Sequence, residues 1–465
     1  MNNKKEIRTR YAPSPTGYLH IGGARTALFC FLFAKHNNGK FIFRLEDTDV
    51  ARNVENGEKS QLENLSWLGI EPDESPINPN PKYGKYRQSE KLERYLLVAN
   101  QMIENNLAYI AYDSPKELEQ QKKEQESKGI FSFRYDRNWL KISNEEKERR
   151  FKNKEYSIRV SLPKNKDYQW DDLVRGKIIV NSDEIGDWVI IKSDGYPTYN
   201  FAVVIDDHDM DISHVLRGEE HITNTPKQLA IYDLLNWNPP KFGHLTIITN
   251  MEGKKLSKRD LSLFQFIEDY KKQGYIPEAI FNFLCLLGWT SSDSKEIMDK
   301  NELISKFDYK RLSKSPSKFD IQKMNWFSKK YMQNKDDDEL ISKLNFEEIE
   351  NYEWKKIFVE TFKQSCSTIN EMQTSLNMFK KDLQPIEKYE NEVVTVFIEQ
   401  LKIRDFNVDS IQEAINKTKE ITKKNGKELF MPIRLATTNL EHGPELAKTI
   451  FLFGKNKIYK RLGII

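Results

Sequence analysis

A strand, a turn rich in proline and glycine, a helix and a second strand follow one another at the start of the chain, and few folds accommodate that order. Apolar residues predict the two strands at 7–12 and 40–45. The string P-S-P-T-G at 13–17 breaks the first strand, and apolar residues at helical spacing predict a helix over 20–36. Such a βαβ unit implies a parallel sheet that binds ligands at the carboxyl ends of its strands.

A long insertion interrupts this α/β pattern, which then resumes. Residues 71–81 are predicted to form a loop, and 116–128 a charged helix that faces solvent. Inside the insertion, strands are predicted at 156–163 and 177–180. The elements predicted after it are strands at 187–192, 199–205 and 244–249 and a helix at 226–235.

The chain changes character beyond residue 262. Helical spacing predicts helices at 264–270, 277–287 and 296–307, and almost only helix-like periodicity follows from residue 331 to the end. We therefore predict an α/β part that is divided by an insertion and followed by an all-α part.

Charge excludes a histone-like polycation. The 465 residues hold 73 Lys+Arg and 70 Asp+Glu, a net charge of +3. Residues 331–465 carry −1 and residues 1–330 carry +4, so any contact with nucleic acid must depend on local charge. With 38% hydrophobic and 12% aromatic residues the chain can build cores, which excludes global disorder.

The three cysteines lie far apart and form neither a disulfide framework nor a C-x-x-C metal signature, which fits a reducing cytosol. They are Cys30, Cys285 and Cys366. The first residues, MNNKKEIRTR, lack the apolar core of a signal peptide. The longest apolar run, Ala27–Ala34, is much shorter than the ~20 residues of a membrane span. We expect a soluble, cytoplasmic protein with no membrane partner.

The first string that carries chemistry is Y-A-P-S-P-T-G-Y-L-H-I-G-G at 11–23. It places His20 at the start of a helix, where unpaired N–H groups and the positive end of the helix dipole favour phosphate. Gly22 and Gly23 let a nucleotide lie close to the backbone. A lone His20 could equally be a capping residue, but the whole string favours a nucleotide site.

The second string is K-K-L-S-K-R at 254–259, between a predicted strand and a predicted helix. Two lysines three residues apart on a loop can reach one polyphosphate and neutralise the charge that builds up on leaving pyrophosphate. Alone, such a string is more often a solvated basic loop. No G-x-x-x-x-G-K-[ST] string is present, so a P-loop is not the phosphate site.

Together the two strings resemble the HIGH and KMSKS signatures of class I aminoacyl-tRNA synthetases. Further strings narrow the resemblance to the bacterial glutamyl-tRNA synthetase family, over essentially the full chain. They are R-T-R-Y-A-P-S-P-T-G at 8–17, F-R-L-E-D-T-D at 43–49, Y-R-Q-S-E at 86–90, P-T-Y-N-F-A at 197–202, H-V-L-R-G-E-E-H at 214–221, L-F-M-P-I-R-L-A at 429–436 and E-H-G-P-E-L at 441–446.

The resemblance implies a Rossmann-like class I catalytic domain and an all-α anticodon-binding domain. The parts implied are the catalytic domain at 1–80 and 191–262, an inserted acceptor-stem-binding subdomain at 81–190, a helical stem-contact region at 263–330 and the anticodon domain at 331–465. It also implies a monomer that uses ATP with Mg²⁺ to join L-glutamate, through glutamyl-adenylate, to the 2′-OH of the terminal adenosine of tRNA(Glu). Charging of tRNA(Gln) as well is left open.

The family's functional positions carry over residue by residue. The catalytic residues implied are His20, Lys255 and Lys258. The ATP-binding residues implied are Ser14, His20, Gly22, Gly23, Lys255, Leu256, Ser257 and Lys258. The glutamate-binding residues implied are Arg10, Ser14, Glu46, Tyr199 and Arg217. Gly23 stands where the general motif has its second histidine, so a single imidazole is expected to face the phosphates.

One departure concerns a metal. Many family members begin a zinc site with C-x-C in the insertion, but Ala111 and Asp113 stand at those positions. The partner region 134–140 also lacks Cys and His. Since zinc needs about four N or S ligands, we predict no zinc and no other metal ligand set.

Three alternatives remain at this point. Glutaminyl-tRNA synthetase shares the catalytic fold but has a β-barrel anticodon part, whereas 331–465 is predicted to be helical. The truncated glutamyl-queuosine relative lacks an anticodon part, for which 331–465 is available here. A non-catalytic RNA-binding paralogue is disfavoured because His20, Lys255 and Lys258 are all present.

Overall fold

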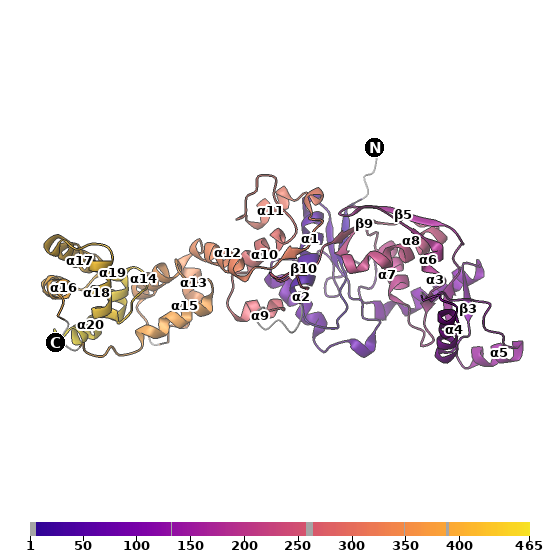
Figure 1. Ribbon diagram of the computed structural model, residues 1–465, viewed down its shortest axis with the longest axis horizontal. Helices are drawn as coiled ribbons and strands as arrows, with labels where there is room; N and C mark the ends of the chain where they lie inside the picture. Colours follow the sequence, from indigo (N-terminus) through magenta and orange to yellow (C-terminus); the bar gives the residue numbers. More distant parts are fainter. Residues whose placement is uncertain (1–5, 132, 257–263, 348, 387–389) are drawn as a thin grey trace. The chain divides into compact units, whose positions relative to one another are not determined.

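The computed structural model describes residues 6–131, 133–256, 264–347, 349–386 and 390–465 (Figure 1). The chain forms two compact units. The first comprises Met1–Glu268 with Phe281–Asp320, and the second comprises Asp269–Ile280 with Ile321–Ile465.

A four-stranded sheet in the order β2-β1-β8-β9 organises the first unit. Its strands are β1 (Arg8–Tyr11), β2 (Lys40–Phe43), β8 (His214–Gly218) and β9 (Lys241–Leu245). Every neighbouring pair is parallel, with Thr9 of β1 opposite both Phe41 of β2 and His214 of β8. The predicted α/β fold with a parallel sheet is therefore confirmed, and the carboxyl ends of these strands meet at one edge.

Helix α1 (Ile21–His36) connects β1 to β2, as predicted. The helix packs on the sheet, so it is buried from Ile21 to Ala34 except for the partly exposed Gly22 and Thr26. The helix ends at His36 and is capped by Asn37, and Gly39 then leads the chain into β2. A Cβ at Gly39 would collide with the carbonyl oxygen of Ile7, so only glycine allows this close approach.

The predicted strand at 199–205 is wrong, because these residues begin helix α7 (Tyr199–Asp209). Phe201–Asp207 is buried throughout, so its apolar run shows no amphipathic period that would distinguish a helix from a strand. Strand β8 was not predicted as an element. The predicted strand at 244–249 is divided between β9 and the two-residue β10 (Ile248–Thr249), which pairs with β11 (Ser317–Lys318).

The insertion contains a three-stranded antiparallel sheet and a separate hairpin. The sheet consists of β3 (Ala108–Ala111), β4 (Ser157–Val160) and β7 (Val189–Ile191), and the hairpin of β5 (Asp167–Asp172) and β6 (Gly176–Asn181). The turn of the hairpin lies against the main sheet, since the amide of Leu173 donates to the carbonyl of Phe242 in β9 over 2.8 Å. The inserted segment therefore contributes residues next to the central sheet.

The remaining elements of the first unit are mostly helical. They are η1 (Val50–Arg52), α2 (Gly57–Trp67), η2 (Gln88–Lys91), α3 (Leu92–Glu104), α4 (Pro115–Ser127), α5 (Asn144–Lys152), α6 (Ser182–Ile185), η3 (Glu219–Asn224), α8 (Thr225–Leu234), α11 (Lys300–Lys306) and η4 (Tyr309–Arg311). Helices α9 (Ile267–Lys272) and α10 (Pro277–Leu286) lie where the chain passes between the two units.

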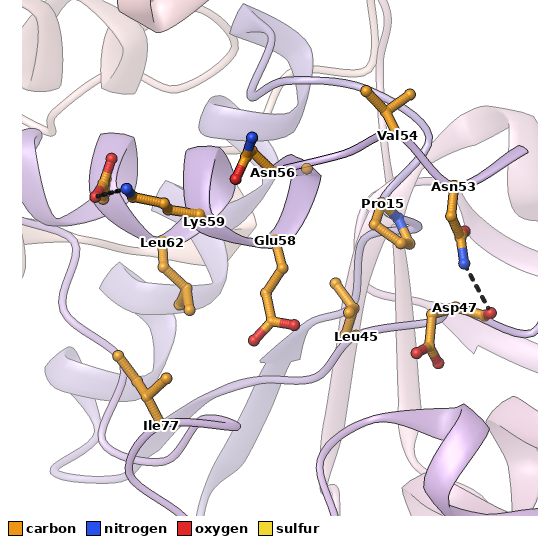
Figure 2. Close-up of a pocket in the computed structure, with 12 residues that line it drawn as sticks. Pro15, Leu45, Asp47, Asn53, Val54, Asn56, Glu58, Lys59, Leu62 and Ile77 are labelled. Carbon is orange, nitrogen blue, oxygen red and sulfur yellow. Dashed lines mark hydrogen bonds and ion pairs between the residues drawn. The ribbon is translucent and has the colours of Figure 1, made fainter. Parts of the chain in front are cut away.

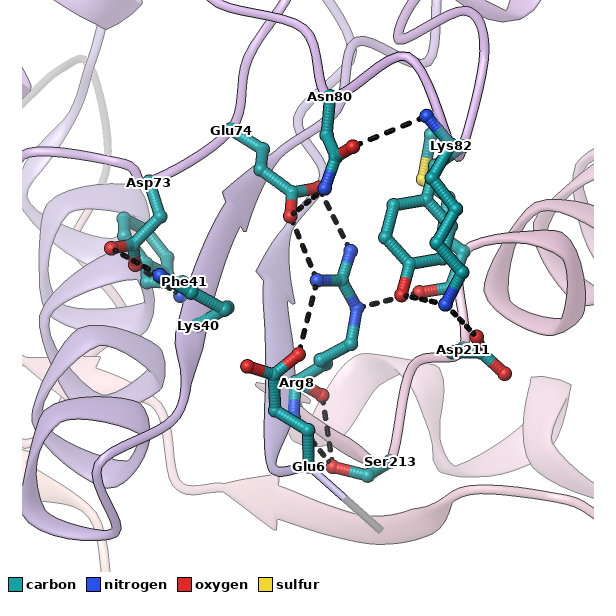
Figure 3. A network of polar contacts seen from close by, with 12 residues as sticks. Glu6, Arg8, Lys40, Phe41, Asp73, Glu74, Asn80, Lys82, Asp211 and Ser213 are labelled. Carbon is teal, nitrogen blue, oxygen red and sulfur yellow. Dashed lines mark hydrogen bonds and ion pairs between the residues drawn. The ribbon is translucent and has the colours of Figure 1, made fainter.

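The amino ends of β1 and β2 are closed by a charge-matched network (Figure 3). Arg8 donates from both amino groups to the two carboxylate oxygens of Glu74, each over 2.8 Å, and Tyr86 donates to the same carboxylate. Asp73 accepts from Lys35 and from the amide of Phe41, both at 2.8 Å. Arg8 and Glu74 are buried as a matched pair, which offsets the cost of burying each charge, while Lys35 and Asp73 are partly exposed.

The second unit is helical among its described residues. Its elements are α12 (Ile321–Gln333), α13 (Asp337–Lys343), α14 (Tyr352–Phe362), α15 (Ile369–Leu376), η5 (Asn377–Phe379), α16 (Glu392–Lys402), α17 (Val408–Thr422), α18 (Lys427–Thr438), α19 (Leu446–Phe453) and α20 (Lys455–Arg461). The described part of 331–465 contains no strand, so it is not the β-barrel of the glutaminyl alternative. No described helix is both long and apolar enough to cross a membrane.

Candidate active site

Four of the five predicted glutamate-binding residues lie at the carboxyl edge of the sheet or on α7 beside it. Arg10 is the last residue but one of β1, Glu46 follows β2, Arg217 lies in β8 and Tyr199 begins α7. Arg10, Glu46 and Arg217 expose only 4–6% of their surface, so the sheet edge holds an unusual group of buried charges.

Asp207 of α7 connects two of the arginines. It accepts from Nε of Arg10 at 3.2 Å and from Arg44 at 2.7 Å. Burial opposes its ionisation, but Arg10 and Arg44 hold the pKa of the Asp207 carboxyl below its usual range. Because Nε is the only guanidinium nitrogen of Arg10 that hydrogen-bonds to the described residues, its two amino groups remain for a ligand.

Glu46 is bound by Arg44, the arginine that also binds Asp207. The second amino group of Arg44 donates to Oε1 of Glu46 over 3.1 Å. Burial raises the pKa of Glu46, against the opposing effect of Arg44 and Arg10. A cationic ligand group beside Glu46 would favour its ionised form.

Arg217 is a buried cation with neutral partners only. It donates to Oγ1 of Thr225 over 2.8 Å and, through Nε, to Nε2 of His244 over 3.2 Å. Its remaining amino group, Nη1, is buried without a partner in the described structure. Burial lowers the pKa of Arg217, and no described carboxylate lies within ion-pair distance of it. The arrangement therefore favours an incoming anion.

Tyr199, beside this group of buried charges, faces His221. Its hydroxyl lies 3.3 Å from Nδ1 of His221. Burial lowers the pKa of His221 to about 4, so the imidazole is neutral at pH 7 and can accept from the tyrosine. Burial also raises the pKa of Tyr199, which keeps its proton.

The predicted phosphate-binding residues lie on two exposed segments. His20 is the N-cap of α1, where Nδ1 accepts from the amide of Gly23 over 3.1 Å, and the first turn holds no acidic side chain. Lys255 is exposed and forms a β-bridge with Thr249, next to Leu256. Ser257 and Lys258 lie outside the described residues.

Ser14 is exposed on the turn that precedes α1, and none of its contacts joins it to the buried group. Its neighbour Pro13 does reach the group, because the Pro13 carbonyl accepts from the amide of Glu46 over 2.9 Å. The turn and the buried charges are therefore adjacent along the backbone, while Ser14 itself points to solvent.

A cavity of about 520 Å³ lies beside the same turn (Figure 2). Its apolar lining includes Leu45, Val54, Leu62 and Ile77. Its three carboxylates are already engaged, since Asp47 accepts from Ser89 at 2.6 Å, Glu58 accepts from Arg87 at 2.7 Å and Glu63 pairs with Lys59 at 3.8 Å. None of the predicted site residues lines this cavity, so the substrate is not placed there.

Sequence reasoning missed Arg44, Asp207, His244 and Asp172. Arg44 and Asp207 lie 163 residues apart, so no local pattern indicates that they pair. The sequence did contain a signal for Asp207. Two carboxylates, Asp206 and Asp207, directly follow the apolar run at 201–205, and carboxylates next to a core segment need charged partners.

Comparison with known proteins agrees with this geometry. A family model described as "tRNA synthetases class I (E and Q), catalytic domain" matches residues 6–326, and one described as "Anticodon binding domain" matches 323–465. The glutamate–tRNA ligase of Metamycoplasma arthritidis is 66% identical over 463 residues, covering 98% of this chain and 99% of that protein. That of Mycoplasmopsis agalactiae is 64% identical over 460 residues, with coverages of 98% and 99%.

Two solved structures have the same fold throughout. The glutamate-tRNA synthetase of Elizabethkingia anophelis superposes with a TM-score of 0.88, and a glutamate tRNA ligase of Elizabethkingia meningosepticum with 0.89. Each is 33% identical and covers 99% of both chains. The chain therefore belongs to the class I tRNA synthetases of the glutamate and glutamine group. Within that group it is a member of the glutamate–tRNA ligase family.

The space around Gly23 explains why a second histidine is missing from the first motif. A Cβ at Gly23 would lie 2.5 Å from the hydroxyl oxygen of Tyr11, which donates to Gln61. We expect Gly23→Ala to reduce the free energy of unfolding by about 1–3 kcal/mol through overpacking. Tyr11→Phe removes the colliding oxygen, so Gly23→Ala should cost much less in that background.

Urea unfolding of the full chain measures both effects. Gly17→Ala is the matched control, because a Cβ at Gly17 meets no atom within 4 Å. Equal costs of Gly23→Ala with and without Tyr11→Phe would contradict this explanation.

Proposed function

We propose that the buried group binds L-glutamate, which the enzyme activates with ATP as glutamyl-adenylate and transfers to the 2′-OH of the terminal adenosine of tRNA(Glu). The observation that carries the proposal is the uncompensated guanidinium of Arg217. Arg10 pairs with Asp207, and Arg44 pairs with Asp207, Glu46 and Asp206, whereas Arg217 pairs with no carboxylate among the described residues. The side-chain carboxylate of glutamate supplies the missing negative charge.

The roles of the site residues follow from their charges. Arg217 and the free amino groups of Arg10 bind the side-chain carboxylate, with Tyr199 beside them. Glu46 accepts the α-amino group, and Ser14 lies on the adjacent turn. Since this pairing leaves the α-carboxylate unneutralised, it remains free to act as the nucleophile.

ATP lies across the start of α1. His20, Gly22, Gly23, Lys255, Leu256, Ser257 and Lys258 surround its phosphates in this proposal. The first turn of α1 suits an anion, because it carries the positive end of the dipole and no acidic side chain. Bound Mg²⁺ supplies charge neutralisation on the phosphates.

Positioning and electrostatics carry the reaction. The α-carboxylate attacks the α-phosphorus and pyrophosphate leaves, while His20, Lys255 and Lys258 stabilise the charge that accumulates on the leaving phosphates. The adenylate's carbonyl carbon is then attacked by the 2′-OH, and AMP leaves.

The rest of the chain binds tRNA in this proposal. Residues 81–190 hold the acceptor end, 263–330 contact the stem, and 331–465 read the anticodon by stacking and base-edge contacts. We further propose that the enzyme acts as a monomer in the cytoplasm. Aminoacylation of purified tRNA(Glu) and tRNA(Gln) decides whether it charges one acceptor or both.

Replacement of Arg217 by Gln tests the glutamate site. We expect the KM for glutamate to rise about 100-fold or more, because the ligand carboxylate loses its ionic partner, while the KM for ATP stays within about twofold. Arg94→Gln is the matched control, since Arg94 pairs with Asp209 at 2.9 Å away from the group. ATP–pyrophosphate exchange in the presence of tRNA measures both constants, and an unchanged KM for glutamate would refute the proposed role.

We also propose that the insertion functions without zinc. Ala111 offers no ligand atom, and Asp113 accepts a hydrogen bond from Tyr135 over 2.6 Å. The guanidinium of Arg159 lies 3.7 Å from the centre of the Tyr135 ring. Among the described residues, no group of three or more His, Cys, Asp or Glu could hold a metal ion. Hydrogen bonds and cation–π contacts stabilise this part of the insertion.

Metal analysis of the purified enzyme tests this proposal. We expect much less than one zinc per chain by mass spectrometry, and no change in melting temperature after treatment with a chelator. Tyr135→Phe should cost about 0.5–1.5 kcal/mol, because it removes the hydrogen bond to Asp113. Stoichiometric zinc, or a large fall in melting temperature with chelator, would contradict it.

A further inference from the structure

The orientation of Arg217 is fixed from behind by a chain of buried side chains. Nε of Arg217 donates to Nε2 of His244 over 3.2 Å, and Thr225 lies 3.1 Å from the same nitrogen. His244 is fully buried in β9, so it does not reach the ligand space itself. Its position determines where the guanidinium of Arg217 points.

Asp172 sets the tautomer of His244. Nδ1 of His244 lies 2.5 Å from Oδ2 of Asp172. Burial lowers the pKa of His244, and the hydrogen bond from His244 holds the pKa of Asp172 at about 2 despite the opposing effect of burial. A neutral imidazole beside a carboxylate carries its proton on Nδ1, which leaves the lone pair of Nε2 to accept from Arg217.

Asp172 is itself held rigidly. Its Oδ1 accepts from the amides of Val174, Arg175 and His244 over 3.0, 3.0 and 3.1 Å. Its Oδ2 also accepts from Nε1 of Trp170 over 3.2 Å. Such a carboxylate has little freedom to rotate, so it transmits a defined geometry to His244.

The hairpin that carries Asp172 also contacts the segment after Arg217. Arg175, three residues beyond Asp172, forms an ion pair with Glu219 in η3, which directly follows β8. The turn of the β5–β6 hairpin therefore contacts β9 at Phe242 and His244 and the continuation of β8 at Glu219. This part of the inserted segment supports the sheet edge directly.

We infer that Asp172 and His244 are positioning residues for amino-acid recognition, which orient Arg217 through the chain Asp172–His244–Arg217. The inserted hairpin thereby completes the site for the side-chain carboxylate. This inference rests on the proposed role of Arg217, and it adds two residues that do not touch the substrate.

Two amide replacements of His244 distinguish loss of its hydrogen bond to Arg217 from loss of side-chain volume. The amide oxygen of His244→Gln can occupy the place of Nε2 and accept from Arg217. His244→Asn is shorter, so it can reach Asp172 but not Arg217. We expect His244→Asn to raise the KM for glutamate about ten- to hundredfold, with little change in the KM for ATP or tRNA, and His244→Gln to restore most of the loss.

The background of Arg217→Gln provides the decisive control. If His244 acts through Arg217, His244→Asn should produce no further rise in the KM for glutamate once Arg217 is replaced. Circular dichroism and melting temperature establish that each variant folds. If His244→Asn does not fold, Asp172→Asn takes its place: its amide can donate to Nδ1 and move the His244 proton to Nε2, so it should raise the KM for glutamate only while Arg217 is present.

The outcomes distinguish this inference from the proposed function. An unchanged KM for glutamate in Arg217→Gln refutes the proposed function and this inference with it. A raised KM in Arg217→Gln but not in His244→Asn overturns the inference alone. Equal effects of Asn and Gln at 244, or an undiminished effect in the Arg217→Gln background, also overturn it, because both indicate a general structural role.

Discussion

Burying a guanidinium costs free energy unless an anion or sufficient hydrogen bonds replace its water. In the described part of the chain, Arg217 is buried with neutral partners and one amino group without a partner. The opposite edge of the sheet shows what a purely structural solution is. There Arg8 and Glu74 match each other atom for atom. At the carboxyl edge, Arg10 and Arg44 pair with carboxylates but Arg217 pairs with none among the described residues, and an acidic amino acid can supply that missing negative charge.

The strands and helices around the carboxyl edge hold these charged groups in fixed positions. Arg10 and Arg217 come from adjacent parallel strands, so they project from the same edge. Asp207 of α7 holds Arg10 and Arg44, and Arg44 in turn holds Glu46. Arg10, which faces the side-chain carboxylate of the ligand, and Glu46, which faces its α-amino group, are thus connected through Asp207 and Arg44. On the far side of β8, the inserted hairpin fixes Arg217 through His244.

The sequence predicts the local parts of this arrangement well. The βαβ unit, the N-cap position of His20 and the helical C-terminal part all depend on short-range spacing, and the structure confirms them. The wrong strand prediction at 199–205 arose because spacing is uninformative there: a helix that is buried on every side shows no periodic pattern of apolar residues. The resemblance indicated Arg10, Glu46, Tyr199 and Arg217, and the structure brings them to one edge. Arg44 and Asp207 needed the fold itself, because their pairing spans the insertion.

The central claim is that charge balance at the sheet edge selects an anionic amino acid. ATP–pyrophosphate exchange with the unmodified enzyme and tRNA(Glu), compared between glutamate and glutamine, tests it most directly. The two ligands have nearly the same shape and differ in side-chain charge. Since glutamine leaves a buried guanidinium unpaired, kcat/KM should be at least about 10³-fold lower for glutamine than for glutamate. Comparable values for the two amino acids would contradict the account.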